Sequence, residues 1–236
     1  MALKSTSIKL IRLSYQGGAT FLYALFDYGL TKYGIPQGSG MSAVCSNVHL
    51  IHFDQELHKW ASQHDALYRR YSDDLILVIP CNLSSLDYKG IKDEVLHIVS
   101  KYKEYGLEVQ EKKTEIRLYQ NGRVIDENQE VSTLDYLGFV TDGDTVRIRE
   151  KSLFKYYSRA YRKAKTSKRI SLATGRPGPK RELYDIYTHL GSNYKGYGNF
   201  ITYAQEAHQT MKQLKTTSMI RRQIKRHWGR IHKRMR

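Results

Sequence analysis

The sequence has few cysteines, few prolines and no long hydrophobic run. Its 236 residues include two cysteines and four prolines. Cys45 and Cys81 stand in neither a metal-ligand nor a redox spacing, so we expect two reduced, packed thiols in a cytoplasmic protein. No segment approaches the ~20 apolar residues of a membrane span, and no N-terminal run resembles a signal peptide. These absences argue against a disulfide scaffold and give a membrane role little support.

Acidic residues are scarce in the C-terminal part of the chain. Residues 151–236 contain 22 Lys and Arg against three Asp and Glu, whereas the first 150 residues contain 17 against 20. Solubility alone would not concentrate charge in this way, but the phosphates of a polyanion would favour it through counterion release. We expect this segment to contact nucleic acid, and the alternative is a solvated basic helix.

Hydrophobic residues make up 40% of the chain, enough to build a core. Before residue 150, apolar spacing and turn signals predict two helices and a set of short strands. The expected helices cover 42–62 and 91–102, and the expected strands include 66–71, 75–79, 115–119, 123–125, 136–140 and 146–148. After residue 150, helices are expected over 151–166, 180–190 and 198–235.

This change of pattern predicts an α+β protein of two domains. The first, residues 1–150, would be a small antiparallel sheet with helices on one face. The second, residues 151–236, would be helical and basic.

The strongest chemical signal is Tyr71-Ser72-Asp73-Asp74, which stands between two apolar strands. Adjacent carboxylates at a hairpin tip repel each other unless a cation neutralises them, and hard divalent ions take such oxygen ligands. Asp73 and Asp74 therefore predict a site for Mg²⁺, with Mn²⁺ as the alternative. The pair alone is weak evidence, because turns are rich in aspartate for local hydrogen-bonding reasons.

The surroundings of the acidic pair resemble the motifs of reverse transcriptases. A loop from Gly34 to Gly40 precedes a helix, and the acidic hairpin follows, as in motifs B and C of that family. Glu111-Lys112-Lys113-Thr114 resembles motif D, and the run from Leu134 to Phe139 resembles motif E, the primer grip. The bacterial group II intron, retron and defence-associated enzymes are the most similar kinds. The resemblance implies a partial polymerase palm followed by a thumb.

The resemblance also implies roles for single residues. Asp73 would be the principal metal ligand with Asp74 beside it, while Ser72 would lie under the primer terminus. Gln37 and Gly38 would line the nucleotide and template site.

Further roles fall outside the acidic hairpin. Lys113 would act on the leaving pyrophosphate, with Lys112 as the competing choice and an ordinary surface lysine as the alternative. Leu137, Gly138 and Phe139 would position the primer, although Phe139 could equally be core. Contacts to the nucleic-acid backbone are expected from the last helix, through Arg221, Arg222, Lys225, Arg226 and Arg230.

One part of the family pattern is not found. The family places a further catalytic aspartate on the motif A strand, well before motif B, but only 33 residues precede Gly34 and Asp27 stands too close to it. The fingers would also be missing, and the acidic hairpin would be left with an unpaired sheet edge. The chain would be a fragment, half of a split enzyme completed by a second polypeptide, or a protein that has lost catalysis.

The function implied is RNA-directed DNA polymerisation in bacterial antiviral defence or in a retroelement. Deoxynucleoside triphosphates would be added to a 3′ end, with an RNA template and DNA or an RNA–DNA hybrid as partners. The alternatives are a non-catalytic module that binds RNA or a hybrid, and untemplated or protein-primed synthesis.

Overall fold

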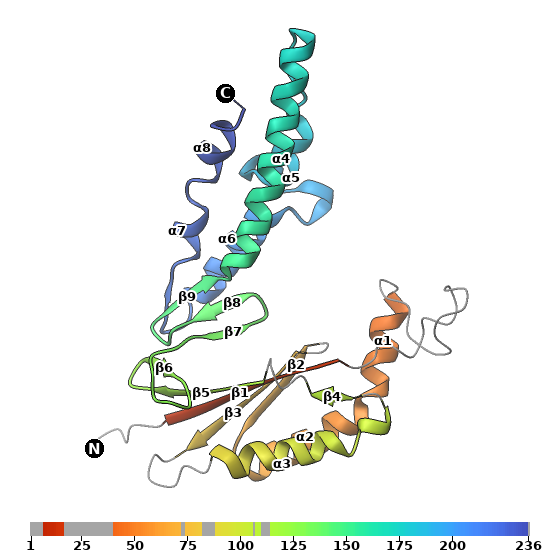
Figure 1. Ribbon diagram of the computed structural model, residues 1–236, viewed down its shortest axis with the longest axis vertical. Coiled ribbons are helices and arrows are strands. Elements are labelled where there is room, and N and C mark those ends of the chain that lie inside the picture. Colours follow the sequence, from red (N-terminus) through yellow and green to blue (C-terminus); the bar gives the residue numbers. More distant parts are fainter. Residues whose placement is uncertain are drawn as a thin grey trace. The chain divides into compact units, whose positions relative to one another are not determined.

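The computed structural model describes residues 7–16, 40–71, 74–81, 88–105, 107–109 and 114–235 (Figure 1). The fold is α+β, as the sequence predicts. The chain divides into two compact units, Met1–Ser132 and Thr133–Arg236. The sequence pattern changes later, at residue 150, because the strands between 133 and 150 pack with the helices that follow them.

The first unit is built on an antiparallel sheet with the strand order β2-β3-β1-β5-β6, and β4 pairs with β1. The strands are β1 (Ser7–Gln16), β2 (Leu67–Tyr71), β3 (Asp74–Cys81), β4 (Glu108–Val109), β5 (Glu115–Gln120) and β6 (Arg123–Ile125). The predicted strands on both sides of the acidic pair are confirmed. The hairpin β5–β6 is confirmed too, and its turn residues Asn121 and Gly122 have φ of 50° and 77°, as a two-residue hairpin loop requires.

Strand β1 corrects one expectation. It lies between β3 and β5, and its register with β3 runs from Ser7↔Cys81 to Ser14↔Asp74. The expected unpaired edge beside the acidic hairpin is therefore wrong, because β1 pairs with β3 along the whole strand. The short apolar alternation of this segment gave no sign of the pairing, since both partners lie more than 50 residues further along the chain.

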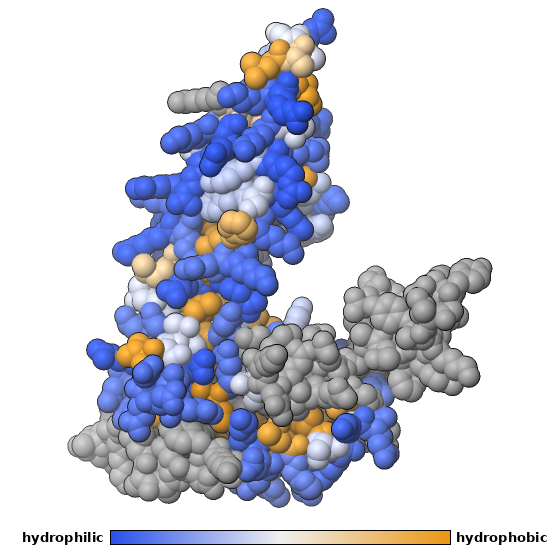
Figure 2. All heavy atoms as spheres, in the orientation of Figure 1, coloured by the Kyte–Doolittle hydropathy of each residue, from blue (hydrophilic) through white to orange (hydrophobic). Residues whose placement is uncertain are grey.

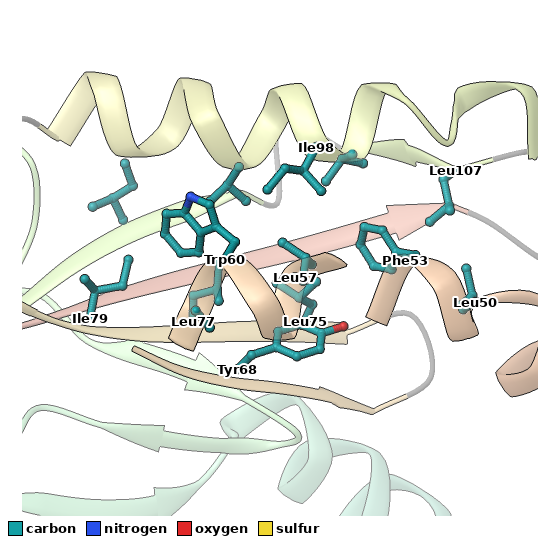
Figure 3. Close-up of a cluster of buried hydrophobic side chains, with 14 residues drawn as sticks. Leu50, Phe53, Leu57, Trp60, Tyr68, Leu75, Leu77, Ile79, Ile98 and Leu107 are labelled. Atoms are coloured by element: carbon teal, nitrogen blue, oxygen red, sulfur yellow. The ribbon is translucent and has the colours of Figure 1, made fainter. Parts of the chain in front are cut away.

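Helices α2 and α3 cover one face of this sheet (Figures 1 and 3). The helices of the unit are α1 (Gly40–His49), α2 (Ile51–Gln63), α3 (Tyr88–Ser100) and the 3-10 helix η3 (Lys103–Tyr105). Leu57, Trp60 and their neighbours form a core with β2, β3, β5 and α3. The helix expected over 42–62 is two helices, and only its second half carries the predicted buried stripe. Val44 and Val48 on α1 are exposed, and so is Cys45, which we expected to be packed.

The second unit begins with a small sheet of order β10-β9-β8-β7. Its strands are β7 (Leu134–Tyr136), β8 (Phe139–Thr141), β9 (Thr145–Ile148) and β10 (Thr217–Ser218), and β10 runs parallel to β9. The strand expected over 136–140 is interrupted at Leu137 and Gly138, whose φ values of 48° and 84° make a turn. Residues 151–235 are helical except for β10 and the connecting loops.

The helices of the second unit pack their apolar faces into two clusters. They are α4 (Glu150–Thr174), α5 (Arg181–Tyr187), α6 (Phe200–Met211), α7 (Ile220–Ile224) and α8 (His227–His232), with 3-10 helices η5 (His189–Gly191) and η6 (Tyr194–Gly196). The single helix expected over 198–235 is wrong, because it is broken by β10 and again before His227. The basic C-terminal helices do bury one face, since Ile220, Ile224 and Ile231 are buried.

Among the described helices, none has both the length and the apolar character that crossing a membrane demands.

Candidate active site

The acidic hairpin is formed by β2 and β3, with Tyr71 paired to Asp74 across its tip. Ser72 and Asp73, which connect the two strands, lie outside the described residues. Tyr71 is 68% exposed and Asp74 is half-buried, so both residues that flank the tip meet solvent. Leu75, next along β3, is buried in the core and fixes the start of the strand.

A part-buried ion pair ties β2 to helix α2. The guanidinium of Arg70 donates to both carboxylate oxygens of Asp54, from Nε to Oδ1 at 2.8 Å and from Nη2 to Oδ2 at 2.6 Å. The hydroxyl of Tyr68 donates to the same Oδ1 at 2.6 Å. The Arg70 side chain is 8% exposed. Because a bidentate pair fixes orientation as well as distance, α2 positions the strand that leads into the acidic pair.

Sequence reasoning missed Asp54 and gave Arg70 no role. No local sequence pattern indicates the pair, because Asp54 lies 16 residues before Arg70 and on a different element, α2. Arg70 also donates to the side-chain oxygen of Asn47, at 3.2 Å.

The oxygen donors at the hairpin tip suit a hard divalent cation. Mg²⁺ uses one or two protein carboxylates and completes its shell with water and substrate phosphates, so Asp74 and the adjoining Asp73 have the right chemistry for it. In the part of the chain that the structure describes, no group of three or more His, Cys, Asp or Glu residues could hold a metal ion.

Several predicted site residues lie outside the described residues and are not placed by the structure. They are Gln37, Gly38, Ser72, Asp73, Lys112 and Lys113.

The predicted primer-grip residues form the turn between β7 and β8 in the second unit. The amide of Arg149 donates to the carbonyl of Gly138 at 2.8 Å, and its guanidinium pairs with Asp135, with Nε and Oδ1 2.8 Å apart. Phe139 packs against the core of this unit, so the core alternative applies to its side chain. Leu137 is exposed. The pair Asp135–Arg149 braces the turn, and no local sequence pattern indicated it.

The predicted nucleic-acid residues are not equivalent. Arg221, Arg222, Lys225, Arg226 and Arg230 are all exposed. The face of the second unit that Figure 2 shows is largely hydrophilic. The guanidinium of Arg230 lies 5.1 Å from the ring centroid of Tyr157, so this side chain also packs on the helix α4. Arg221 and Lys225 line a cavity, whereas Arg222 and Arg226 do not.

Comparison with known proteins adds one match. A family model described as reverse transcriptase (RNA-dependent DNA polymerase) matches residues 24–141, which is half of the chain. The matched range contains the whole acidic hairpin and the turn between β7 and β8. A search of curated proteins returned no significant match.

Proposed function

Because the chain belongs to the reverse transcriptase family, we propose that it is the palm and thumb portion of an RNA-directed DNA polymerase. It would add deoxynucleotides from their triphosphates to a 3′ end, with RNA as the template. The observation that carries this proposal is the β2–β3 hairpin, in which Tyr71 and Asp74 flank the tip and meet solvent and a part-buried ion pair fixes β2 on α2.

Asp73 and Asp74 are the proposed ligands of Mg²⁺ or Mn²⁺, which when bound supplies the positive charge that in-line displacement at a triphosphate requires. The Arg70–Asp54 pair holds β2, the strand that leads into these carboxylates, in place before substrate arrives. Lys113 is the proposed group at the leaving pyrophosphate.

The substrate strands are proposed to lie against three other groups of residues. Gln37, Gly38 and Ser72 would line the nucleotide and template, and the turn at Leu137, Gly138 and Phe139 would hold the primer. The backbone of the RNA–DNA hybrid would lie against the exposed cations of α7, of α8 and of the junction between them, Arg221, Arg222, Lys225, Arg226 and Arg230.

The third carboxylate of the metal site is not supplied by the strand beside the hairpin. The β1 sequence, SIKLIRLSYQ, contains neither Asp nor Glu. A polymerase site with two ions normally takes a further aspartate, so we propose that it comes from another segment or from a second polypeptide. A role in bacterial antiviral defence or in a retroelement follows from the sequence resemblance alone.

The second candidate is a non-catalytic module that binds RNA or a hybrid. It is favoured by the concentration of positive charge after residue 150 and by the absence of a carboxylate from β1. Two adjacent carboxylates at a hairpin tip argue against it, because they would weaken binding to a polyanion without serving chemistry.

Asp73→Asn separates the two candidates. In a polymerisation-competent setting, primer extension on an RNA template should fall more than about a hundredfold, which corresponds to about 3 kcal/mol of transition-state stabilisation. Affinity for the hybrid should stay the same or rise, because a negative charge is removed. Asp65→Asn is the matched control, since Asp65 is an exposed aspartate whose φ of 50° asparagine also tolerates. Near-normal synthesis by Asp73→Asn would refute the metal-site proposal.

A further inference from the structure

A basic cavity opens in the second unit beside helices α6, α7 and α8. Its volume is about 520 Å³. The lining has three cationic side chains, three imidazoles, two amides and one aliphatic side chain. These residues are Lys212, Arg221, Lys225, His189, His208, His227, Gln205, Gln209 and Ile224. No carboxylate and no Phe, Tyr or Trp ring is among them.

The histidines are oriented by partners around the cavity. His227 Nδ1 lies 2.8 Å from the carbonyl oxygen of Ile224, which can only accept, so Nδ1 carries the proton. His227 Nε2 then accepts from His189 Nδ1, 3.2 Å away. The second nitrogen of the exposed His189 ring is left for another partner. His208 is held by Ser218, with Nδ1 and Oγ 2.9 Å apart.

In the part of the chain that the structure describes, no carboxylate forms an ion pair with the cations of the cavity. Within the described part of the second unit, the ion pairs join other cations to acids: Arg149 to Asp135, Lys163 to Glu182 and Arg181 to Asp185. Lys212, Arg221 and Lys225 line one cavity, and none of them forms an ion pair with an acid among the described residues. Like charges gathered in a concave site repel each other, and a multiply charged anion would relieve that repulsion.

We propose that this cavity binds a terminal phosphate, the phosphomonoester or triphosphate at the 5′ end of a nucleic acid or of a free nucleotide. A terminal phosphate carries about −1.5 to −2 at pH 7, whereas each phosphate inside a strand carries a single charge. Three converging cations match the larger charge. None of the described lining residues is Phe, Tyr or Trp, and the imidazoles of His208 and His227 are held by hydrogen bonds, so the cavity suits the phosphate better than the nucleoside. This inference adds a ligand to the nucleic-acid contact proposed for the C-terminal helices. It rests on that contact only if the phosphate belongs to the end of a nucleic-acid strand, and not if it belongs to a free nucleotide.

The test uses the full chain and three 3′-labelled single-stranded RNAs of one sequence, which end in a 5′-hydroxyl, a 5′-monophosphate or a 5′-triphosphate. Fluorescence anisotropy should give an affinity that rises along this series, by about tenfold or more between its ends. Inorganic tripolyphosphate and a free nucleoside triphosphate are then added as competitors. If the free nucleoside triphosphate competes at concentrations similar to that of the RNA, the bound phosphate belongs to a free nucleotide. If it competes only at large excess, the bound phosphate belongs to the end of a strand. Equal affinity for all three RNAs, without competition by tripolyphosphate, would overturn the proposal.

Two pairs of substitutions locate the preference. Arg221→Gln with Lys225→Gln removes two cations of the lining and should bring the triphosphate-to-hydroxyl affinity ratio close to one. Arg222→Gln with Arg226→Gln is the matched control, because these arginines are exposed neighbours outside the cavity. The control should weaken the binding of all three RNAs to the same extent and leave the triphosphate-to-hydroxyl affinity ratio unchanged. A ratio that survives in the cavity variant would refute the site.

A further variant guards against loss of fold as an explanation. Gln209→Glu adds a carboxylate to the lining at an exposed position and should abolish the preference without removing a cation. Retention of the preference by this variant would also count against the site. If the wild-type chain binds none of the RNAs but still binds tripolyphosphate, the nucleic-acid contact of the proposed function fails, while the phosphate site stands with the free nucleotide as its source.

Discussion

Replacing Asp54 by alanine should destabilise the first unit by about 3 kcal/mol. The carboxylate of Asp54 accepts two hydrogen bonds from Arg70 and one from Tyr68. The Arg70 side chain is 8% exposed and that of Asp54 is 26% exposed. Removal of one partner from a buried ion pair typically costs about 3–5 kcal/mol, because a charge is left without compensation. The partial exposure of Asp54 places the expected loss at the lower end of this range.

Urea denaturation followed by tryptophan fluorescence measures this loss. Trp60 belongs to the core of the first unit and Trp228 to the second unit, so a Trp228→Phe background makes the signal specific. Arg70→Met combined with Asp54→Ala should recover part of the stability, since no buried charge then remains unpaired.

Lys101→Ala is the control for the Asp54 substitution. Lys101 pairs with Glu56 on the same helix α2, with Nζ and Oε1 2.5 Å apart, but its side chain is 48% exposed. Solvent-exposed pairs contribute about 0.2–1 kcal/mol, so this change should be small. A loss below about 1 kcal/mol for Asp54→Ala, or one no larger than that of Lys101→Ala, would refute the conclusion that this pair anchors the acidic hairpin.

Three further predictions follow from the fold and the charges. The chain alone should give no primer extension on an RNA template with Mg²⁺ or Mn²⁺, and addition of a polypeptide with fingers and motif A should produce extension. Extension by the chain alone would point to Asp27 as the carboxylate that completes the metal site. Binding to single-stranded RNA should depend strongly on salt. Arg222→Gln with Arg226→Gln should reduce the magnitude of the slope of log affinity against log salt by about 1.4, at about 0.7 for each lost phosphate contact. An unchanged slope would mean that these arginines are solvated and do not contact the RNA. Burial lowers the pKa of His227 below its ordinary value of 6.5, so the unfolded chain takes up a proton more readily than the folded one. The stability that results is present above about pH 6.5 and is lost as the pH falls through the folded pKa, so melting temperatures should decline towards pH 5 and the decline should be flatter in His227→Gln.

Local chemistry decided which parts of the fold could be predicted. The strands around the acidic pair and the hairpin at Asn121-Gly122 depend on apolar alternation and on residues that adopt positive φ, so a window of about ten residues contains the signal. The turn at Leu137 was missed because only Gly138 favours the left-handed conformation, and the apolar run through it looked like one strand. Palm and thumb roles for the two units stay a prediction.

Contacts between distant residues account for the other misses. The break in the expected helix over 198–235 depends on β10, whose partner is β9, about 70 residues earlier in the chain. The start of α6 was open to prediction, since Asn199 accepts from the backbone of Ile201 and Thr202 in a capping box. The basic cavity joins residues from 189 to 227, and no periodic pattern links its histidines to its cations.

The position of β1 limits how the acidic hairpin can be completed. It pairs with β3 from Ser7↔Cys81 to Ser14↔Asp74, and with β5 on its other side, yet it carries no carboxylate. A strand that brought an aspartate into this place would first have to separate β1 from β3, β5 and β4, at a net cost of about 0.5–1.5 kcal/mol for each hydrogen bond lost. A segment that approaches the tip from beyond Gln16, the last residue of β1, would not have to displace the strand pairings that the structure describes. Since Asp74 stands opposite Ser14, close to that end, the second route is favoured, and a complementing polypeptide should be designed to reach the tip from there.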